Sequence, residues 1–212
     1  MIDSATSVGL PHQLLCLRDE RGGVIAGNWQ RWLGRAAAED ERLLDRAVGP
    51  VLDVGCGPGR HLLALARRGV DCLGIDVTPS AVRLAVSRGA TAVEGSIFGP
   101  VPGSGTWATA LLLDGNIGIG GDPAALLARV ASVLRPGGRI LVELSGPGTS
   151  GAPERARVEH DNVTGPWFGW ASVGASCIEG FTAEAGLRLD GPWCAGDRWF
   201  AQIDTSGQMA RR

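Results

Sequence analysis

Residues 51–76 hold the side chains whose types and spacing could do chemistry. The run reads VLDVGCGPGRHLLALARRGVDCLGID, with one acid at Asp53, three glycines at alternate positions after it, and a second acid at Asp76. Glycine has no Cβ and tolerates positive φ, so such a loop can turn sharply and let a ligand contact its backbone. A carboxylate at the end of a following strand can accept hydrogen bonds from ribose hydroxyls. The stretch therefore predicts a nucleotide-type binding site.

Local patterns on either side place this loop between two strands. Val51–Val54 is a short apolar run, which is typical of a buried parallel strand. Arg60–Arg68 has apolar residues at helical spacing and is followed by Gly69, where a left-handed C-terminal cap belongs. A second apolar run, Val70–Ile75, ends at Asp76. Strand, glycine loop, helix, strand and acid together predict a nucleotide-binding βαβ unit.

The glycine spacing decides between classes of nucleotide site. A dinucleotide fingerprint needs G-x-G-x-x-G, but the residue three positions after Gly57 is Arg60, which argues against a nicotinamide-dependent dehydrogenase. The chain has neither G-x-x-x-x-G-K-[ST] nor any lysine, which excludes a phosphate-loop NTPase. The remaining pattern, D-x-G-x-G-x-G from Asp53 to Gly59, resembles motif I of the class I S-adenosylmethionine-dependent methyltransferases. The resemblance covers about residues 48–145 and includes an L-x-P-G-G turn.

This resemblance implies an α/β fold, namely a doubly wound, seven-stranded, mostly parallel sheet with an antiparallel last strand pair and helices on both faces. It implies S-adenosylmethionine as the cofactor, with the glycine loop beneath its amino-acid end and the acid of the second strand at its ribose. A G-[DS]-x segment would touch the adenine, and serine replaces the usual acid there. The residues that the resemblance assigns to cofactor binding are Asp53, Gly55, Cys56, Gly57, Gly59, Asp76, Val77, Ser96, Ile97 and Asp114.

The rest of the chain supplies the other elements of such a fold. Helices are predicted at Asn28–Ala38, at Glu39–Ala47, after Thr78-Pro79, after Asp122-Pro123 and at Ser172–Ala185. Strands are predicted at Ala90–Glu94, Trp107–Leu113, Arg139–Leu144, Leu187–Cys194 and Arg198–Asp204. Residues 1–24 are weakly patterned, and 146–165 are predicted to be a polar loop. We divide the chain into an N-terminal helical or lid segment, 1–47, and an S-adenosylmethionine-binding methyltransferase domain, 48–206.

Catalysis would take place where the fourth predicted strand ends. Ligands bind beyond the carboxyl ends of strands in a doubly wound sheet, which places Asp114 and Asn116 at the reacting end of the cofactor, with loop-stabilising Asx turns as the alternative. Methyl transfer is an in-line displacement from a sulfonium, and a general base is needed only if the nucleophile arrives protonated. We name Asn116, His160 and His61 as candidate catalytic residues, the two histidines as possible bases. The alternatives are a solvated loop histidine and a helix-start hydrogen bond.

Four tryptophans could form walls of an acceptor pocket. Trp29 and Trp32 are three residues apart and share a helix face, whereas Trp167 and Trp170 lie in the segment that would overhang the site. The alternative is a purely structural role, in which they pack the N-terminal helix on the sheet and anchor the long loop. A pocket made from these segments alone favours a small-molecule acceptor. The missing [DN]-P-P-[FYW] signature argues against methylation of a nucleobase.

Composition excludes several classes of partner. The 212 residues carry a formal net charge of −2 without a cluster of basic residues, so we expect no nucleic-acid partner. No apolar run approaches the ~20 residues of a membrane span, and no basic-then-apolar leader is present. Five cysteines without a C-x-x-C pair indicate neither a disulfide framework nor a metal site, and Cys56 is read as a small loop filler. We expect a metal-free cytoplasmic enzyme.

Two alternatives to methyl transfer stay open at this point, because a fold does not fix its chemistry. The same fold and cofactor could serve decarboxylation or cyclisation. The chain could also be a non-catalytic, cofactor-binding subunit of a larger complex. The acceptor, the atom that is methylated and the oligomeric state are open as well.

Overall fold

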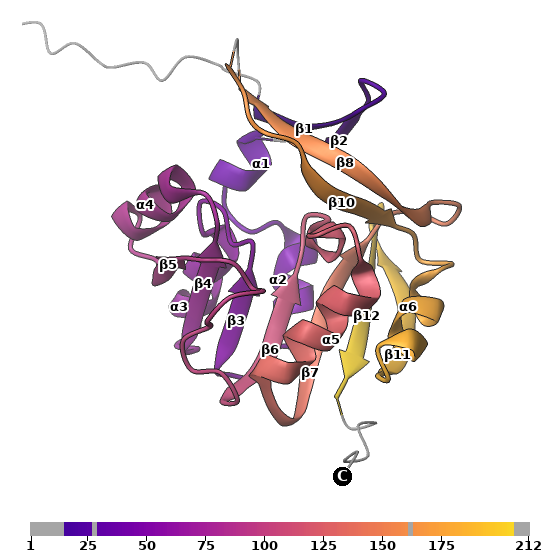
Figure 1. Cartoon of the computed structure of the whole chain (residues 1–212). Coiled ribbons are helices and arrows are strands. Elements are labelled where there is room, and N and C mark those ends of the chain that lie inside the picture. The colour runs from indigo at the N-terminus through magenta and orange to yellow at the C-terminus, as the bar shows by residue number, and fades with distance from the viewer. Residues whose placement is uncertain (1–14, 27–28, 161–162, 206–212) are drawn as a thin grey trace, which may run out of the picture.

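The computed structural model describes residues 15–26, 29–160 and 163–205, which form two β-sheets with flanking helices (Figure 1). The larger sheet has seven strands in the order β11-β12-β7-β6-β3-β4-β5. They are β3 (Val51–Val54), β4 (Cys72–Asp76), β5 (Ala92–Glu94), β6 (Trp107–Leu112), β7 (Leu134–Leu144), β11 (Arg188–Ala195) and β12 (Arg198–Asp204). Strands β3, β4, β5, β6 and β7 run parallel to one another, and β12 pairs antiparallel with both β7 and β11. The predicted sheet, with its antiparallel last pair, is confirmed.

Helices lie on both faces of this sheet. They are α1 (Trp29–Leu33), α2 (Ala38–Leu44), α3 (Arg60–Arg67), α4 (Pro79–Ser87), α5 (Pro123–Val133) and α6 (Ile178–Glu184), with a short 3-10 helix, η1 (Asn116–Gly118). In Figure 1, α5 and α6 stand in front of the sheet. Proline at the first position starts both α4 and α5, where its missing N–H costs no helical hydrogen bond.

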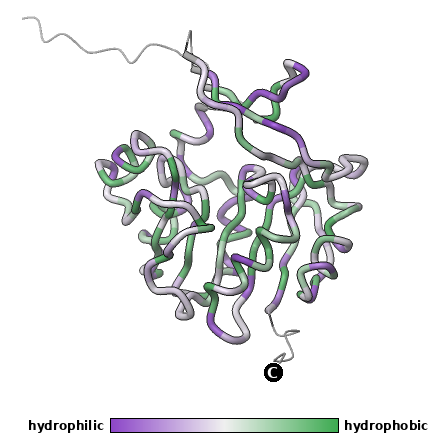
Figure 2. The backbone as a smooth tube through the Cα atoms, in the orientation of Figure 1, coloured by the Kyte–Doolittle hydropathy of each residue, from purple (hydrophilic) through white to green (hydrophobic). Residues whose placement is uncertain are grey.

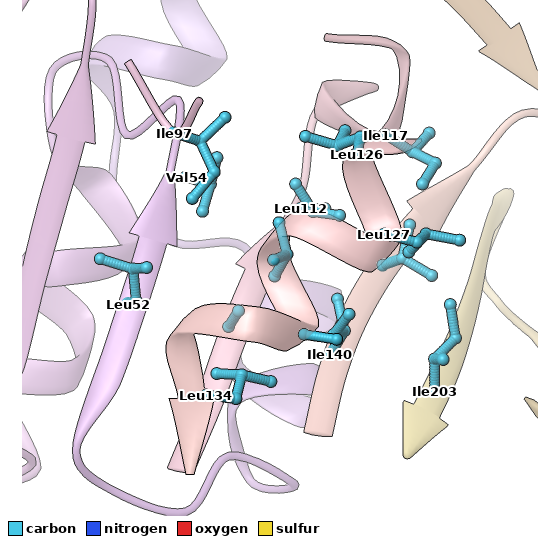
Figure 3. Close-up of a cluster of buried hydrophobic side chains, with 14 of the residues drawn as sticks. Leu52, Val54, Ile97, Leu112, Ile117, Leu126, Leu127, Leu134, Ile140 and Ile203 are labelled. Carbon is cyan, nitrogen blue, oxygen red and sulfur yellow. The ribbon is translucent and has the colours of Figure 1, made fainter. Parts of the chain in front are cut away.

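The central strands are buried on both sides and feed two cores. Successive strand residues point to opposite faces, so Leu52 joins Leu127 of α5 in one core (Figure 3), whereas Val51 joins Leu65 of α3 in the other. Each buried leucine contributes about 1.5–3 kcal/mol relative to an exposed one. Figure 2 shows hydrophobic residues concentrated along these central strands. The cores therefore fix the loops at the carboxyl ends of the strands.

A second, smaller antiparallel sheet lies above those carboxyl ends in Figure 1, and we call it the lid sheet. Its strands follow the order β10-β8-β1-β2, with β9 paired to β8. They are β1 (Leu15–Asp19), β2 (Val24–Ala26), β8 (Ser150–His160), β9 (Val163–Thr164) and β10 (Phe168–Val173). Two segments far apart in the sequence thus build one layer over the seven-stranded sheet.

The lid sheet overturns three expectations. The predicted polar loop at 146–165 contains β8, and the weakly patterned head contains β1, because each strand completes its hydrogen bonds on the other. An ion pair across them joins Arg18 to Glu159, with Arg18 Nε 2.6 Å from the carboxylate. The helix predicted from Ser172 starts only at Ile178, since the preceding residues belong to β10.

Smaller differences concern element ends. α1 is one short helix that stops before Gly34, not a helix to Ala38. β7 begins at Leu134, and its pairing with β6 then jumps to Arg139, so the L-x-P-G-G turn is an irregularity within the strand, with Gly137 at φ +73°. Across the described ranges, no helix combines the length and apolar character needed to cross a membrane.

Candidate active site

The glycine loop after β3 is held by backbone and side-chain hydrogen bonds. Gly55 has φ +71°, and its N–H donates to Ile75 O of β4 at 2.8 Å. Asn116 Nδ2 donates to Val54 O at 2.8 Å and to Gly55 O at 3.0 Å. A Cβ at Gly55 would lie only 2.6 Å from that nitrogen. Asn116 therefore holds the loop in place by contacts that need glycine there.

Asp76 at the end of β4 is aimed by two backbone donors. Its Oδ2 accepts from Gly57 N and its Oδ1 from Thr78 N, both at 2.8 Å. A Cβ at Gly57 would meet no protein atom within 4 Å. Gly57 and Asp76 both line the cavity described next, so the loop offers it open backbone and the carboxylate offers it free lone pairs.

A cavity of about 850 Å³, here the large cavity, lies between the carboxyl ends of β3, β4 and β6 and the lid sheet. Its walls include eight of the residues predicted to bind the cofactor: Gly55, Cys56, Gly57, Asp76, Val77, Ser96, Ile97 and Asp114. The lid sheet adds Cys16, Leu17, Val158, Phe168, Gly169 and Trp170. Asp53 and Gly59 are not among the lining residues: Asp53 is buried beside His61, and a Cβ at Gly59 would press on α4 and the turn after it.

A second cavity of about 260 Å³, here the small cavity, adjoins the first at the ends of β6 and β7. Trp32, Asp114 and Trp170 line both cavities and so form their junction. The small cavity also has Arg31 and Glu143 in its wall. Two of the four predicted tryptophans therefore stand where a second ligand would meet the first.

A buried charged cluster underlies this junction. Its four carboxylates, three guanidinium groups and one imidazole belong to Arg31, Asp40, Asp53, Arg60, His61, Asp114, Glu143 and Arg198. At its centre is Asp40, which has no exposed surface. Asp40 Oδ2 accepts from Ala37 N at 2.8 Å and from Arg60 Nη1 at 3.0 Å, and its Oδ1 accepts from Arg198 Nη1 at 2.6 Å. Asp40 of α2 thereby links α3 to β12.

The arginines of the cluster orient the two carboxylates that reach the small cavity. Arg60 Nη2 donates to both oxygens of Asp114, at 2.7 and 2.8 Å. Arg198 donates to both oxygens of Glu143, at 2.8 and 2.6 Å, and Glu143 also accepts from Asp114 N at 2.8 Å. Arg31 Nη2 lies 3.7–3.9 Å from oxygens of three cluster carboxylates. Asp40, Asp114 and Glu143 are therefore fixed in position, because each lies against at least two of the three arginines.

His61 is part of this cluster rather than a free base. Its two ring nitrogens lie 3.7 Å from Asp40 Oδ1 and from Asp53 Oδ2. Burial alone would lower the pKa of His61, but the two carboxylates raise that pKa to about 9. A protonated imidazole at neutral pH balances the charges of the cluster. It has no free lone pair with which to take a proton.

The remaining predicted residues fall elsewhere. The backbone of His160 pairs with Leu15 and Val163 in the lid sheet, but its side chain lies outside the described residues, as does that of Trp29. Trp167 stacks under the Arg157 guanidinium, 4.6 Å from ring centre to Cζ, and is absent from both cavity walls. Burial raises the pKa of the Cys56 thiol, which stays protonated, in line with a loop filler.

Sequence reasoning missed most of the charged cluster. Asp40 sits among three acids of α2 and has no distinguishing pattern there. Glu143 does carry a signal, because an acid within the apolar run of β7 must find buried partners. Arg198 begins the last strand, and only the folded topology brings it to Asp40.

Comparison with known proteins agrees with the resemblance carried by the glycine loop. A family model described as a methyltransferase domain matches residues 51–138. One curated relative, a ubiquinone biosynthesis O-methyltransferase from Xanthomonas euvesicatoria pv. vesicatoria, is 31% identical over 109 residues, which cover 47% of this chain and 44% of the relative. The chain thus aligns with less than half the length of that relative.

Solved structures share the fold. An S-adenosylmethionine-dependent methyltransferase from Bacteroides fragilis, in complex with S-adenosylhomocysteine, has a TM-score of 0.75 at 23% identity, over 90% of this chain and 86% of that one. The glycopeptide N-methyltransferase MtfA, also with S-adenosylhomocysteine, has a TM-score of 0.61 at 15% identity, over 81% and 90% of the two chains. At these identities the solved structures show a shared fold, and the family model assigns a methyltransferase domain to part of the chain, residues 51–138.

Proposed function

We propose that this chain, whose domain and fold are those of the class I S-adenosylmethionine-dependent methyltransferases, transfers a methyl group from S-adenosylmethionine to a small-molecule acceptor. The observation that carries the proposal is the pair of adjoining cavities at the carboxyl edge of the sheet. The large one has the glycine loop and Asp76 in its wall, and the small one meets it at Trp32, Asp114 and Trp170. One cavity for a cofactor and one for an acceptor suit a transfer reaction.

The residues of the large cavity fit this cofactor. The open space at Gly57 accepts a ligand against the backbone, and the free lone pairs of Asp76 suit two ribose hydroxyls. Ser96 and Ile97 would border the base, and Asp114 would lie near the amino-acid end. Bound there, the cofactor supplies an electrophilic methyl group on a sulfonium, and transfer leaves S-adenosylhomocysteine.

The chain's own contribution would be positioning and exclusion of water. Asn116 fixes the glycine loop, and the cluster arginines fix Asp114 and Glu143 at the acceptor side. The apolar inner face of the lid sheet covers the cavity, which strengthens electrostatic interactions inside it. Alignment of nucleophile and methyl group can itself supply several kcal/mol of barrier reduction. Asn116 is accordingly a positioning residue in this proposal.

The division into a lid segment, 1–47, and a methyltransferase domain, 48–206, is part of the proposal, with residues 150–173 added to the lid. A role in specialised metabolism is a further part of the proposal, since the many glycines and the arginine-only set of basic residues would suit such an enzyme. The cytoplasmic location stays a prediction from the sequence. The O- and N-methyltransferases among the similar proteins support small acceptors as a class.

Calorimetric titration with S-adenosylhomocysteine tests the cofactor assignment, with NADH as the control ligand. We expect binding of the former alone, and severe loss of it in Asp76→Ala. The matched control is Asp71→Ala, which removes an exposed acid just before β4. Unchanged affinity in Asp76→Ala would refute the assignment. Stoichiometric formation of S-adenosylhomocysteine during turnover separates methyl transfer from decarboxylation, cyclisation or mere cofactor binding.

A further inference from the structure

The small cavity presents more negative than positive groups to a ligand. The charged side chains in its wall are Asp114, Glu143 and Arg31. Of the arginines that bind the two carboxylates, Arg198 lines neither cavity and Arg60 lines only the large one. A ligand in the small cavity therefore meets two carboxylates and one guanidinium group, that of Arg31. Such a wall disfavours an anionic acceptor, whether carboxylate, phenolate or thiolate.

The aromatic side chains in the wall also favour a cationic ligand over an anionic one. Trp32 and Trp170 line the cavity on the side of its junction with the large one. The face of an indole ring carries negative quadrupole charge, so it attracts cationic and N–H groups. The hydroxyl-bearing residues Ser145 and Ser172 complete the polar lining. The ligand group that complements this wall is a hydrogen-bond donor.

Among the described residues of this wall, Glu143 and Asp114 are poorly suited to act as general bases. This distinguishes a hydroxyl acceptor, which needs a base, from an amine acceptor, which does not. Burial alone would raise the pKa of Glu143, but hydrogen bonds from Arg198, the Asp114 N–H and the charge of Arg31 lower it. Asp114 has Arg60 on both of its oxygens and Arg31 3.9 Å away. An alkyl hydroxyl must lose its proton as it attacks and needs a base, whereas an unprotonated amine attacks directly.

We infer that the acceptor is an amine, whose nitrogen binds in the small cavity with N–H groups toward Asp114 and Glu143. The inference rests on the proposed function and narrows it. In the step, the nitrogen lone pair forms the new N–C bond as the C–S bond breaks. The positive charge moves from sulfur to nitrogen, next to the two carboxylates, and one proton then passes from nitrogen to water. The carboxylates stabilise the charge that develops and remain ionised throughout.

Acceptors of matched skeleton test the inference on the wild-type chain. Benzylamine, benzyl alcohol, benzyl mercaptan and benzoate, with butylamine, butanol and butyrate as a second set, are incubated with S-adenosylmethionine, and S-adenosylhomocysteine and methylated product are measured. We expect N-methylated product at least about tenfold faster than any O- or S-methylated one. The rate should rise with pH as the amine loses its proton. The apparent pKa of the pH–rate profile should therefore follow the pKa of the amine used.

Faster or equal transfer to oxygen or sulfur overturns the inference. So does the absence of transfer to either amine in a chain that binds S-adenosylhomocysteine, and the proposed function then survives without it. Failure to bind S-adenosylhomocysteine instead overturns the proposed function itself. The three results are therefore distinguishable.

Two substitutions test where the nitrogen of the acceptor amine binds. Glu143→Gln should raise the KM for benzylamine about tenfold, with S-adenosylhomocysteine affinity unchanged, whereas Glu184→Gln, an exposed acid of α6, should change neither. Because Glu143 is also an ion-pair partner of Arg198, Trp32→Leu provides a second variant outside the cluster. It should raise the same KM severalfold by removing one aromatic face. An unchanged KM in both variants would place the amine elsewhere and overturn the inference.

Discussion

Asp40 is a carboxylate with no exposed surface, and its two oxygens serve two arginines that are themselves almost completely buried. Burial alone would raise its pKa, but His61 and the arginines lower it, so the residue stays ionised. Removing one partner of a buried ion pair is costly, because the other charge then lacks compensation. The cluster is therefore sensitive to single changes.

Asp40→Asn should destabilise the protein by about 3–5 kcal/mol, since Arg60 and Arg198 would lose their shared counterion. Urea unfolding measures this free energy. The control is Asp45→Asn at the end of the same helix, where the exposed Asp45 pairs with Arg68 and its loss should cost at most about 1 kcal/mol. Equal losses in the two variants would contradict the account of the cluster.

His61 makes stability depend on pH on the alkaline side. Its folded-state pKa of about 9 lies above its ordinary value of 6.5, so its contribution is complete below about pH 6.5 and is lost as pH rises through about 9. The difference amounts to at most about 3 kcal/mol. Wild type should therefore lose more stability than His61→Gln between pH 6 and pH 10, measured by urea unfolding. Subtracting the two curves removes the shared effect of the buried cysteines, and parallel curves would refute the assignment.

At the scale of elements, α4 joins the glycine loop to the N-terminal segment. Arg88, the C-cap of α4, donates to Pro58 O at 3.0 Å and to Leu33 O at 2.8 Å, at the end of α1. One guanidinium thus bridges the loop below the large cavity and the helix that carries Trp32. The glycine loop and α1 should therefore become ordered together.

Arg88→Met should raise the dissociation constant for S-adenosylhomocysteine several-fold and speed amide exchange at residues 29–35, because two carbonyls lose a charged donor. Calorimetry and hydrogen–deuterium exchange measure the two effects. Arg83→Met, an exposed change on the same helix, should leave both unchanged. Weaker binding without faster exchange would show that loop and helix are not coupled through Arg88.

The same scale explains what the sequence could and could not predict. The central strands, such as Trp107–Leu112, are apolar runs that indicate buried strands by themselves. The lid strand Ser150–His160 contains proline and many charges, and it becomes a strand through pairing with β1, which begins at Leu15, and with β10. The site divides likewise: the glycine loop and Asp76 are close in sequence, whereas Asp40 and Arg198 are 158 residues apart. Local patterns predict local structure, and the charged cluster depends on tertiary pairing.

For the whole molecule, the cofactor product should act as a stabiliser, since it would bind only the folded chain. At S-adenosylhomocysteine concentrations about a hundredfold above its Kd, the gain is about 2.7 kcal/mol, or about 5–10 °C in Tm for a chain of this size. Thermal unfolding followed by fluorescence measures it, with NADH as the control. Asp76→Ala should show no such rise, and a rise of equal size in that variant would contradict the assignment of the large cavity.

The lid sheet lies outside the segment that the methyltransferase family model matches. The matched residues 51–138 include the glycine loop and Asp76, while β1, β2, β8 and β10 all fall beyond them. Most residues that line the large cavity fall inside the matched segment, whereas most residues that line the small cavity fall outside it. Similarity measured over the matched segment therefore bears on the proposed cofactor site more than on the proposed acceptor site. Replacing the lid sheet by that of a relative should accordingly change the acceptor more than the cofactor.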